Sequence, residues 1–324
     1  MAGRVEARGP PAGVVRDAPA AAEEVRRARD FALAEKAAAT RRAYRSDFLI
    51  FSGWCAERGV EPLRAAPEAV GAFLAAQAGR GMTASTVARR LAAIRHAYAL
   101  KGLEPPTGAE AVKAVVRGIR RALGTAPRRK APATDAVLAA MLEHVPDDRR
   151  GRRDRALLLL GFAGALRRGE LVELRVEDLT FLPEGLRVRV RRSKTDQEGR
   201  GQEIAIPNGS RLRPVAAVEA WLADAGITEG HVLRPLLEGG RVTDQPLSTK
   251  SVADIVKRHA GAAGLDPARF SGHSLRAGFI TSAAEAGEDA LRIAEVSRHR
   301  SLDVLQGYVR RSNLFKKHAG EGFL

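Results

Sequence analysis

The sequence predicts a mainly α-helical protein with one small antiparallel β-sheet. Most of the chain is rich in alanine and leucine, and its large apolar residues recur three or four positions apart, as along one face of a helix. Apolar and polar residues alternate strictly, as in a strand, only in short segments between residues 179 and 206. Hydrophobic residues make up 45% of the 324 residues, which is enough to bury the cores of two domains.

The first predicted domain is a compact helical bundle over residues 29–123. It follows residues 1–28, which are rich in alanine, glycine, proline and charge and are expected to form a flexible tail. We expect four helices that begin at a capping residue or at a proline, because both favour the first turn. The predicted starts are Thr40, Pro67, and Ser85 or Thr86, and the fourth helix runs through Val112, Val115, Val116, Ile119 and Leu123.

The third of these helices is predicted to have two distinct faces. Its apolar face, which would pack into the bundle, holds Val87, Leu91, Ile94 and Tyr98. The opposite face, which is expected to be exposed, carries Arg89, Arg90 and Arg95.

The second predicted domain spans residues 134–324, and a linker at 124–133 precedes it. The linker sequence, GTAPRRKAPA, contains two prolines and three consecutive basic residues and has no periodicity. Thr134 restarts the helical pattern. Further helical patterns in this domain cover residues 213–225, 248–263, 274–287 and 289–297.

The predicted sheet lies in this second domain. Two segments alternate in the manner of half-buried strands, with apolar positions at Leu186, Val188 and Val190 and then at Ile204 and Ile206. The polar stretch SKTDQEGRGQ between them is expected to be a long hairpin turn, so the two strands would pair antiparallel. Leu179 and Phe181 are candidates for a third strand.

The chain is strongly basic, with a formal net charge of +16 and a sequence pI of about 10.9. This balance indicates a polyanionic partner, nucleic acid before a membrane surface. Because only nine of the 54 basic residues are lysine, GC-rich coding is an alternative source of the arginines. Cys55 is the single cysteine, which excludes a disulfide or a cysteine-based metal site within the chain. The sequence has no signal-peptide core and no apolar run long enough for a membrane span, so we expect a cytoplasmic protein.

Four short motifs in the second domain suit one chemical task. GALRRGEL, residues 164–171, is expected on an apolar helix that runs from Leu157, and a lysine lies in the hairpin. SGHSLR, residues 271–276, opens a later helix, and RHRSLDVLQGYVR, residues 298–310, places a histidine nine residues before a tyrosine. Singly, each has an ordinary explanation as a helix cap, a solvated turn residue or a half-buried aromatic. Their joint occurrence in this order is far more specific.

In this order the motifs resemble the catalytic set of the tyrosine recombinases, the phage integrase family. The resemblance covers about residues 130–318 and extends more weakly to the helical domain, which is similar to the family's core-binding domain. It implies a two-domain clamp around duplex DNA, with no metal ion and no other cofactor. Gly169 stands where many members have serine, a change expected to alter local helix packing rather than chemistry. The implied catalytic residues are Arg167, Lys194, His273, Arg276, His299 and Tyr308, with Glu170 in a supporting role.

These residue types also suit strand exchange on chemical grounds. A phenol can attack phosphorus and later leave, so the energy of the phosphodiester is retained and rejoining needs no ATP. Two arginines can hold the charged phosphate oxygens by paired hydrogen bonds. The lysine can protonate the departing 5′-oxygen, which an arginine effectively cannot do. The histidines can donate to phosphate oxygens or move the tyrosine proton.

The resemblance also implies contacts to duplex DNA and an assembly of several protomers. Leu314 and Phe315 near the C-terminus would pack either on a neighbouring protomer or on their own domain. The first arrangement suits a homotetramer that bridges two duplexes, formed from a free monomer or dimer. The side chains expected to contact DNA are Arg89, Arg90, Arg95, Arg128, Arg129, Lys130, Lys250 and Lys257, together with Arg258.

Two other functions remain open from the sequence. A type IB topoisomerase would share the fold, the tyrosine and the arginines, but it would relax supercoils without site preference. A DNA-binding accessory protein without catalysis would explain the charge but not the complete motif set. The target DNA sequence and the biological outcome (integration, excision, resolution or inversion) are not encoded in any recognisable motif.

Overall fold

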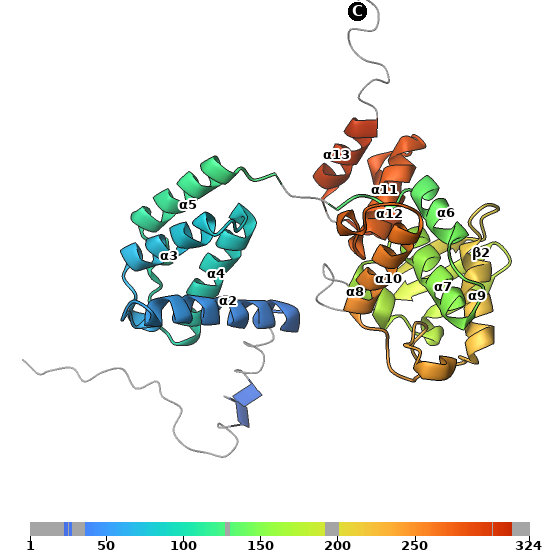
Figure 1. Ribbon diagram of the computed structural model, residues 1–324, viewed down its shortest axis with the longest axis horizontal. Coiled ribbons are helices and arrows are strands. Elements are labelled where there is room, and N and C mark those ends of the chain that lie inside the picture. Colours follow the sequence, from blue (N-terminus) through green and yellow to red (C-terminus); the bar gives the residue numbers. More distant parts are fainter. Residues whose placement is uncertain are drawn as a thin grey trace, which may run out of the picture. The chain divides into compact units, whose positions relative to one another are not determined.

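The computed structural model describes residues 23, 24, 26, 27, 36–126, 130–191, 201–299 and 301–312. The chain divides into two compact units, Met1–Pro127 and Arg128–Leu324, and each is considered by itself (Figure 1). Most of the predicted tail and the C-terminal residues Leu314 and Phe315 lie outside the described residues. The domain limits drawn from the sequence therefore stay predictions.

The first unit is a helical bundle around an aromatic and aliphatic core. Phe51 and Phe73 meet edge to face with ring centroids 5.0 Å apart, and Ile94 is fully buried beside them. This core comes from the apolar faces predicted by the periodicity. The helices are α2 (Ala38–Ala56), α3 (Pro67–Gly79), α4 (Ala84–Leu100) and α5 (Glu110–Leu123), with short 3-10 turns η1 (Pro62–Arg64) and η2 (Pro106–Gly108).

Two predicted helix starts in this unit were wrong. Thr40 lies inside α2, which begins at Ala38 after Ala37 and has no side-chain cap. Thr83 caps α4 by accepting a hydrogen bond from the Thr86 backbone at 3.3 Å, so neither Ser85 nor Thr86 is the cap. Pro67 does occupy the first turn of α3, as predicted. Several neighbouring hydroxyls compete for one cap position, and only the backbone geometry decides between them.

Tyr98 is a structural residue of this bundle. Its side chain is 3% exposed, and its hydroxyl donates to the Pro62 carbonyl at 3.0 Å while accepting from the Ala65 backbone at 3.0 Å. Both hydrogen-bonding roles of the phenol are therefore used to hold the turn after α2.

The second unit is mostly helical and contains a small sheet, which confirms the predicted fold class. The four later helical patterns appear as helices, and Thr134 caps the first helix through the Val137 backbone at 3.4 Å. A final helix, α13, had not been predicted. The elements are α6 (Asp135–Glu143), α7 (Arg149–Ala163), α8 (Arg168–Glu173), β1 (Leu179–Leu182), β2 (Gly185–Val190), β3 (Gln202–Pro207), α9 (Pro214–Ala225), α10 (Thr249–Ala262), α11 (His273–Glu285), α12 (Ala290–Ser297) and α13 (Leu302–Ser312), with the short turns η3 (Val176–Asp178), η4 (Glu238–Gly240) and η5 (Pro267–Arg269).

The sheet of the described residues has three antiparallel strands in the order β1-β2-β3. Val188 lies opposite Leu179 on one side and Ile204 on the other, so the apolar positions of the three strands share a register. All three predicted strands are present. The last pair of β2 and β3 joins Val190 to Gln202. The predicted hairpin turn covers residues 193–202; residues 193–200 lie outside the described part, and Gln202 already belongs to β3.

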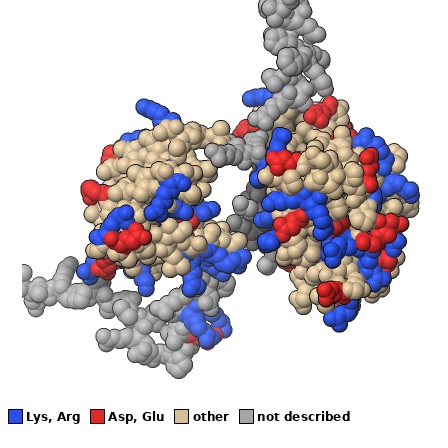
Figure 2. Space-filling model, viewed as in Figure 1, with Lys and Arg blue, Asp and Glu red and all other residues tan. Residues whose placement is uncertain are grey.

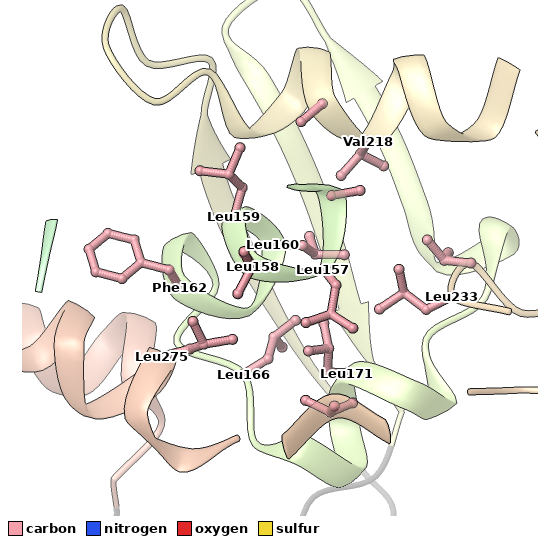
Figure 3. Close-up of a cluster of buried hydrophobic side chains, with 14 of the residues drawn as sticks. Leu157, Leu158, Leu159, Leu160, Phe162, Leu166, Leu171, Val218, Leu233 and Leu275 are labelled. Carbon is pink, nitrogen blue, oxygen red and sulfur yellow. The ribbon is translucent and has the colours of Figure 1, made fainter. Parts of the chain in front are cut away.

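The core of this unit forms around α7, whose four consecutive leucines are at most 1% exposed. A helix that is apolar on every side must be covered on every side. Figure 3 shows these leucines surrounded by side chains of other elements, including Val218 of α9 and Leu275 of α11. Strand residues such as Val188 belong to the same core. Among the described helices, none is long and apolar enough to cross a membrane.

The end of the predicted linker is attached to this unit by backbone hydrogen bonds. The Ala131 backbone donates to the Arg269 carbonyl at 2.7 Å, and Ala133 donates to Ser274 at 2.9 Å. Gly278 of α11 permits this close approach, because a Cβ there would lie 1.8 Å from the Ala133 carbonyl oxygen. The linker segment thus lies along the helix that begins with the His-x-x-Arg motif.

Replacing Gly278 with alanine is expected to lower the free energy of unfolding of this unit by about 3 kcal/mol, because the new methyl group overlaps backbone atoms that cannot rotate away. Chemical denaturation measures the change. The matched control is Gly118→Ala in α5, where a Cβ meets no atom within 4 Å. Alanine there should raise stability by about 0.5–1 kcal/mol. Equal effects of the two substitutions would contradict the close packing at Gly278.

Candidate active site

The motif GALRRGEL forms a sharp turn between two helices rather than one continuous helix, which corrects the prediction. Helix α7 ends at Ala163 and α8 begins at Arg168. Ala165, which lies between them, has a φ of +44°, a left-handed conformation that ends α7. The Ala165 carbonyl therefore takes no part in the backbone hydrogen bonds of α7 and can accept from side chains. Arg167 is the N-cap residue of α8.

Glu170 holds this turn together. Its carboxylate accepts from the Arg167 backbone at 2.9 Å and from the Arg167 guanidinium at 2.6 Å, so it fixes both the backbone and the side chain of that residue. Burial of Glu170 would raise the pKa of its carboxyl, but Arg298 and Arg167 outweigh that effect and hold the pKa below its usual value. The carboxylate is therefore charged at neutral pH. Arg168, by contrast, is exposed.

A Cβ at Gly169 would meet no atom within 4 Å, so the backbone there has room for a side chain such as serine. The expectation that glycine alters the helix packing at this position was therefore wrong. The residue lies on the exposed side of α8.

Arg276 is buried in the first turns of α11, with 1% of its surface exposed. Its Nη1 donates to the Ala165 carbonyl at 2.7 Å, and its Nη2 lies 3.2 Å from His299 Nδ1. Burial, together with the positive charges of Arg167 and Arg298, lowers the pKa of Arg276 to about 9. Three guanidiniums thus gather around one carboxylate, which leaves an excess of positive charge that suits an anion.

His299 follows α12 and lies between Arg276 and Ser297. The Ser297 hydroxyl is 2.8 Å from Nδ1 of the ring. Burial, together with the positive charges of Arg276, Arg167 and their neighbours, lowers the pKa of His299 to about 4. The imidazole is therefore neutral at pH 7. Arg276 donates a hydrogen bond, so the ring nitrogen that faces it must be an acceptor.

This depressed pKa predicts a pH dependence of stability. Folded His299 takes up its proton only near pH 4, whereas an unfolded histidine does so near 6.5. Between these values the unfolded state binds more protons, so the free energy of unfolding should fall as pH drops from about 6.5 to about 4. His299→Gln should flatten that part of the profile, as measured by urea denaturation at several pH values. An unchanged slope would contradict the assignment.

Tyr308 lies on α13, which packs against α11 and α12. Its ring is half-buried against a small apolar cluster that includes Ile280 and Leu305. A negative charge on its phenol oxygen would raise the pKa of Arg276, so the two groups lie within electrostatic reach of each other. His273 is the exposed first residue of α11, and a positive charge on its ring would lower the pKa of His299. These two histidines therefore also lie within electrostatic reach of each other.

The structure therefore brings together most of the catalytic residues predicted from the sequence. Arg167 contacts Glu170, Arg276 contacts His299, and Arg276 also reaches the Ala165 carbonyl in the turn that carries Arg167. Tyr308 and His273 lie within electrostatic reach of this cluster. The remaining residue of the set, Lys194, lies outside the described residues. In the part of the chain that the structure describes, no group of three or more His, Cys, Asp or Glu side chains could hold a metal ion.

The sequence reasoning missed Arg298, which is buried beside Glu170. Its Nη2 donates to the Glu170 carboxylate at 2.8 Å. One feature of the sequence could have pointed to Arg298. It directly follows a predicted helix, at a position where a left-handed glycine is common and an arginine is unusual.

One predicted DNA contact was placed wrongly. Arg90 was expected on the exposed face of α4, but it is 8% exposed, with its guanidinium hydrogen-bonded to Gln77 and 3.7 Å from the Asp47 carboxylate. The buried Asp47 also binds Arg89, which is exposed. A carboxylate inside the bundle draws an arginine inward, and no periodicity of apolar residues reveals this.

The other predicted DNA contacts are exposed where they are described. Lys130 donates to the Ala268 carbonyl at 2.6 Å, and Lys250 pairs with Asp254 at 3.1 Å. Figure 2 shows Lys and Arg side chains distributed over both units on the visible face, with fewer acidic ones among them. Arg95 and Lys257 are exposed, Arg258 pairs with the buried Asp154, and Arg128 and Arg129 lie outside the described residues.

Two family models match this chain. Residues 133–314 match the model of the phage integrase family, and residues 30–102 match the model of the phage integrase N-terminal SAM-like domain. The first match contains the whole cluster described above.

Named relatives align over most of the chain. An integrase/recombinase xerD homolog from Selenomonas ruminantium is 41% identical over 290 residues, which is 88% of this chain and 85% of the relative. A tyrosine recombinase XerC from Xanthomonas campestris pv. campestris (strain B100) is 30% identical over 268 residues, 82% of this chain and 76% of the relative.

Solved structures share the fold at lower identity. A lambda integrase dimer bound to a COC′ core site aligns with a TM-score of 0.60 and 18% identity, over 91% of this chain and 81% of that one. The Tn1549 transposon integrase in complex with transposon right end DNA aligns with a TM-score of 0.60 and 14% identity, over 90% and 96%.

Proposed function

The chain belongs to the phage integrase family of tyrosine-type site-specific recombinases, and from that premise we propose that it cleaves and rejoins duplex DNA at a specific site through Tyr308. The membership confirms the resemblance drawn from the motifs. The observation that carries the residue assignment is the cluster of Arg167, Arg276 and His299 around the turn at Ala165, with Tyr308 within electrostatic reach.

In this proposal the two arginines bind the scissile phosphate. Arg167 and Arg276 are held by separate backbone and carboxylate contacts, so their guanidiniums are positioned before DNA arrives. The mutual repulsion that contributes to the lowered pKa of Arg276 is relieved when an anion sits beside them. A preorganised cationic site of this kind stabilises the extra negative charge of a pentacovalent phosphorus transition state.

The proposed cleavage step is a transesterification. The Tyr308 oxygen attacks phosphorus and loses its proton, the bond to the 5′-oxygen breaks, and a 3′-phosphotyrosine forms. The departing 5′-oxygen takes a proton from Lys194, because an ammonium can act as a general acid at neutral pH and a guanidinium effectively cannot. Attack by a 5′-hydroxyl of another strand reverses these steps, so no metal ion and no ATP enters the balance.

The two histidines assist in different ways in this proposal. His299 is neutral at pH 7, so it can accept the phenol proton or donate a hydrogen bond to a phosphate oxygen. A bound phosphate would favour its protonated form, since it offsets the positive charges of Arg276 and Arg167. His273 is exposed at the start of α11, where it is accessible to a phosphate oxygen.

We propose that the DNA contacts come from exposed basic residues of both units, and that a homotetramer forms when two duplexes are joined, from a free monomer or dimer in the cytoplasm. A dimer on DNA is known for lambda integrase, which shares the fold. Contacts to phosphates would be largely independent of sequence and sensitive to salt. The proposed contacts are Arg89, Arg95, Arg128, Arg129, Lys130, Lys250 and Lys257.

Covalent trapping tests the proposed function. The protein is incubated with pooled nicked DNA from its own genomic neighbourhood, because a nick lets the short 5′-hydroxyl fragment diffuse away and strands the covalent intermediate. A protein–DNA adduct that survives denaturant is expected, attached at a 3′ end, and sequencing of the trapped DNA identifies the site. Folded, DNA-bound protein that forms no adduct with any fragment would refute the proposal.

A second assay separates recombination from the topoisomerase chemistry considered above. A plasmid that carries two copies of the trapped site should yield deletion or inversion products. Relaxation of a plasmid without the site, and no recombinant product from the plasmid with it, would favour the topoisomerase.

A further inference from the structure

Arg298 has an unusual backbone for its residue type. It caps the C-terminus of α12 with φ +56° and ψ +46°, in the left-handed region. This position at the end of a helix favours glycine, because a Cβ crowds the neighbouring carbonyl. An arginine retained there must be stabilised by its side chain.

The side chain of Arg298 is almost completely buried, and both terminal nitrogens of its guanidinium are hydrogen-bonded. Its guanidinium donates to the carbonyls of Gly164 at 3.1 Å, Val296 at 2.8 Å and Ala165 at 3.3 Å, and to the Glu170 carboxylate at 2.8 Å. Three of these four acceptors belong to the turn that carries Arg167. Arg298 therefore binds the end of α12 to that turn.

Both proposed phosphate-binding arginines share acceptors with Arg298. The Ala165 carbonyl accepts from Arg276 at 2.7 Å and from Arg298 at 3.3 Å. The Glu170 carboxylate binds Arg167 through one oxygen and Arg298 through the other, and Arg167 also donates to the Arg298 carbonyl at 3.3 Å. A shift of Arg298 would therefore move both partners at once.

The charges of Glu170, Arg167 and Arg298 also link these side chains. Glu170 is the single carboxylate in direct contact with the described cluster, and it serves two guanidiniums. The Arg298 charge helps to keep the Glu170 carboxyl ionised, and the ionised carboxylate in turn orients Arg167. The immediate neighbour of Arg298 in sequence is His299, which contacts Arg276.

We propose that Arg298 is a positioning residue for catalysis, which holds Arg167 through Glu170 and Arg276 through the Ala165 carbonyl in the geometry that binds the scissile phosphate. This inference rests on the proposed function, and it assigns a role to a residue whose guanidinium contacts the Ala165 carbonyl and the Glu170 carboxylate.

The test compares Arg298→Gly with Arg213→Gly. Glycine tolerates the left-handed backbone, so the first substitution removes the guanidinium without straining the chain. Arg213 is the matched control, since it is also a left-handed arginine, with φ +51°, but its side chain is exposed at the start of α9. Three quantities are measured for each variant: the rate of covalent adduct formation on a nicked site, the affinity for that DNA, and the thermal unfolding midpoint.

Arg298→Gly should slow adduct formation by about 10²-fold, since small displacements of positioned groups have effects of this size, with DNA affinity little changed. Arg213→Gly should leave the rate unchanged. Equal rates for Arg298→Gly and the wild type would overturn the proposal. A loss of rate fully explained by the fraction of unfolded protein at the assay temperature would also overturn it.

A double-mutant cycle tests the route through Glu170. Because both residues are proposed to orient Arg167 through one carboxylate, Arg298→Gly combined with Glu170→Gln should be little slower than the worse single variant. Multiplicative effects of the two substitutions would contradict a shared route. A wild-type protein that forms no adduct at all would refute the proposed function instead, so the two failures are distinguishable.

Discussion

Tyr308→Phe is expected to abolish the covalent protein–DNA adduct while leaving the fold and DNA binding intact. The substitution removes one oxygen atom, and phenylalanine keeps the ring that packs against Ile280 and Leu305. Without the oxygen no nucleophile is available to form a phosphotyrosine bond. Because covalent catalysis needs the reacting atom itself, the amount of adduct formed by Tyr308→Phe should fall below the detection limit of a gel assay.

The matched control for this experiment is Tyr44→Phe in the first unit. Its ring lies 5.3 Å from that of His96, so phenylalanine preserves the contact there as well. Tyr44→Phe should form adduct at the wild-type rate. If Tyr308→Phe still forms an adduct that survives denaturant, another residue is the nucleophile and the assignment of the whole cluster must be revised.

Arg276→Lys is expected to slow adduct formation by about 10²–10³-fold, the effect typical of removing one preorganised donor. Lysine cannot reach the Ala165 carbonyl, His299 and a phosphate oxygen together, as the forked guanidinium can. Burial and two neighbouring guanidiniums already lower the pKa of Arg276 to about 9. A lysine, whose ordinary pKa is about 10.4, would lose its proton near neutrality in the same place.

The activity of Arg276→Lys is expected to depend on pH through the protonation of the new lysine. The ammonium is protonated at lower pH, so the deficit of Arg276→Lys relative to the wild type should shrink as pH falls from about 8 to about 6. The control is Arg269→Lys, an exposed arginine that follows α10 in the turn η5. Single-turnover rates on nicked DNA measure both variants. If Arg276→Lys reacts within about threefold of the wild-type rate, the loss is far smaller than removal of a preorganised donor causes. Arg276 would then not bind the phosphate in the transition state.

Much of the fold followed from local patterns. The helical periodicity predicted α9 to α12, and strict alternation predicted β2 and β3 with the correct buried positions at Leu186, Val188 and Ile204. The third strand, β1, was only a candidate in the sequence. These patterns are reliable because burying one face of a helix or strand requires apolar residues at fixed intervals. The break between α7 and α8 was missed, since nothing in the apolar run Leu157–Phe162 marks the left-handed turn that follows at Ala165.

The positions of buried charges were beyond the reach of periodicity. Arg90 carries the same side chain as the exposed Arg89 beside it, yet it is drawn inward by Asp47 and Gln77. Glu170 was expected as a supporting residue, but its second partner was not. In each case the partner is distant in sequence, and a charge is buried only where such a partner compensates for its desolvation.

The sequence by itself determined the family and the order and identity of the candidate catalytic residues, because strand exchange through a tyrosine requires a nucleophile, phosphate ligands and proton donors of particular types. Only the tertiary structure decided how these side chains are held. The contacts of Arg298 with Glu170 and Ala165 join residues more than 120 positions apart. No local pattern records such a contact, since it arises when the turn after α7 and the end of α12 are buried against each other.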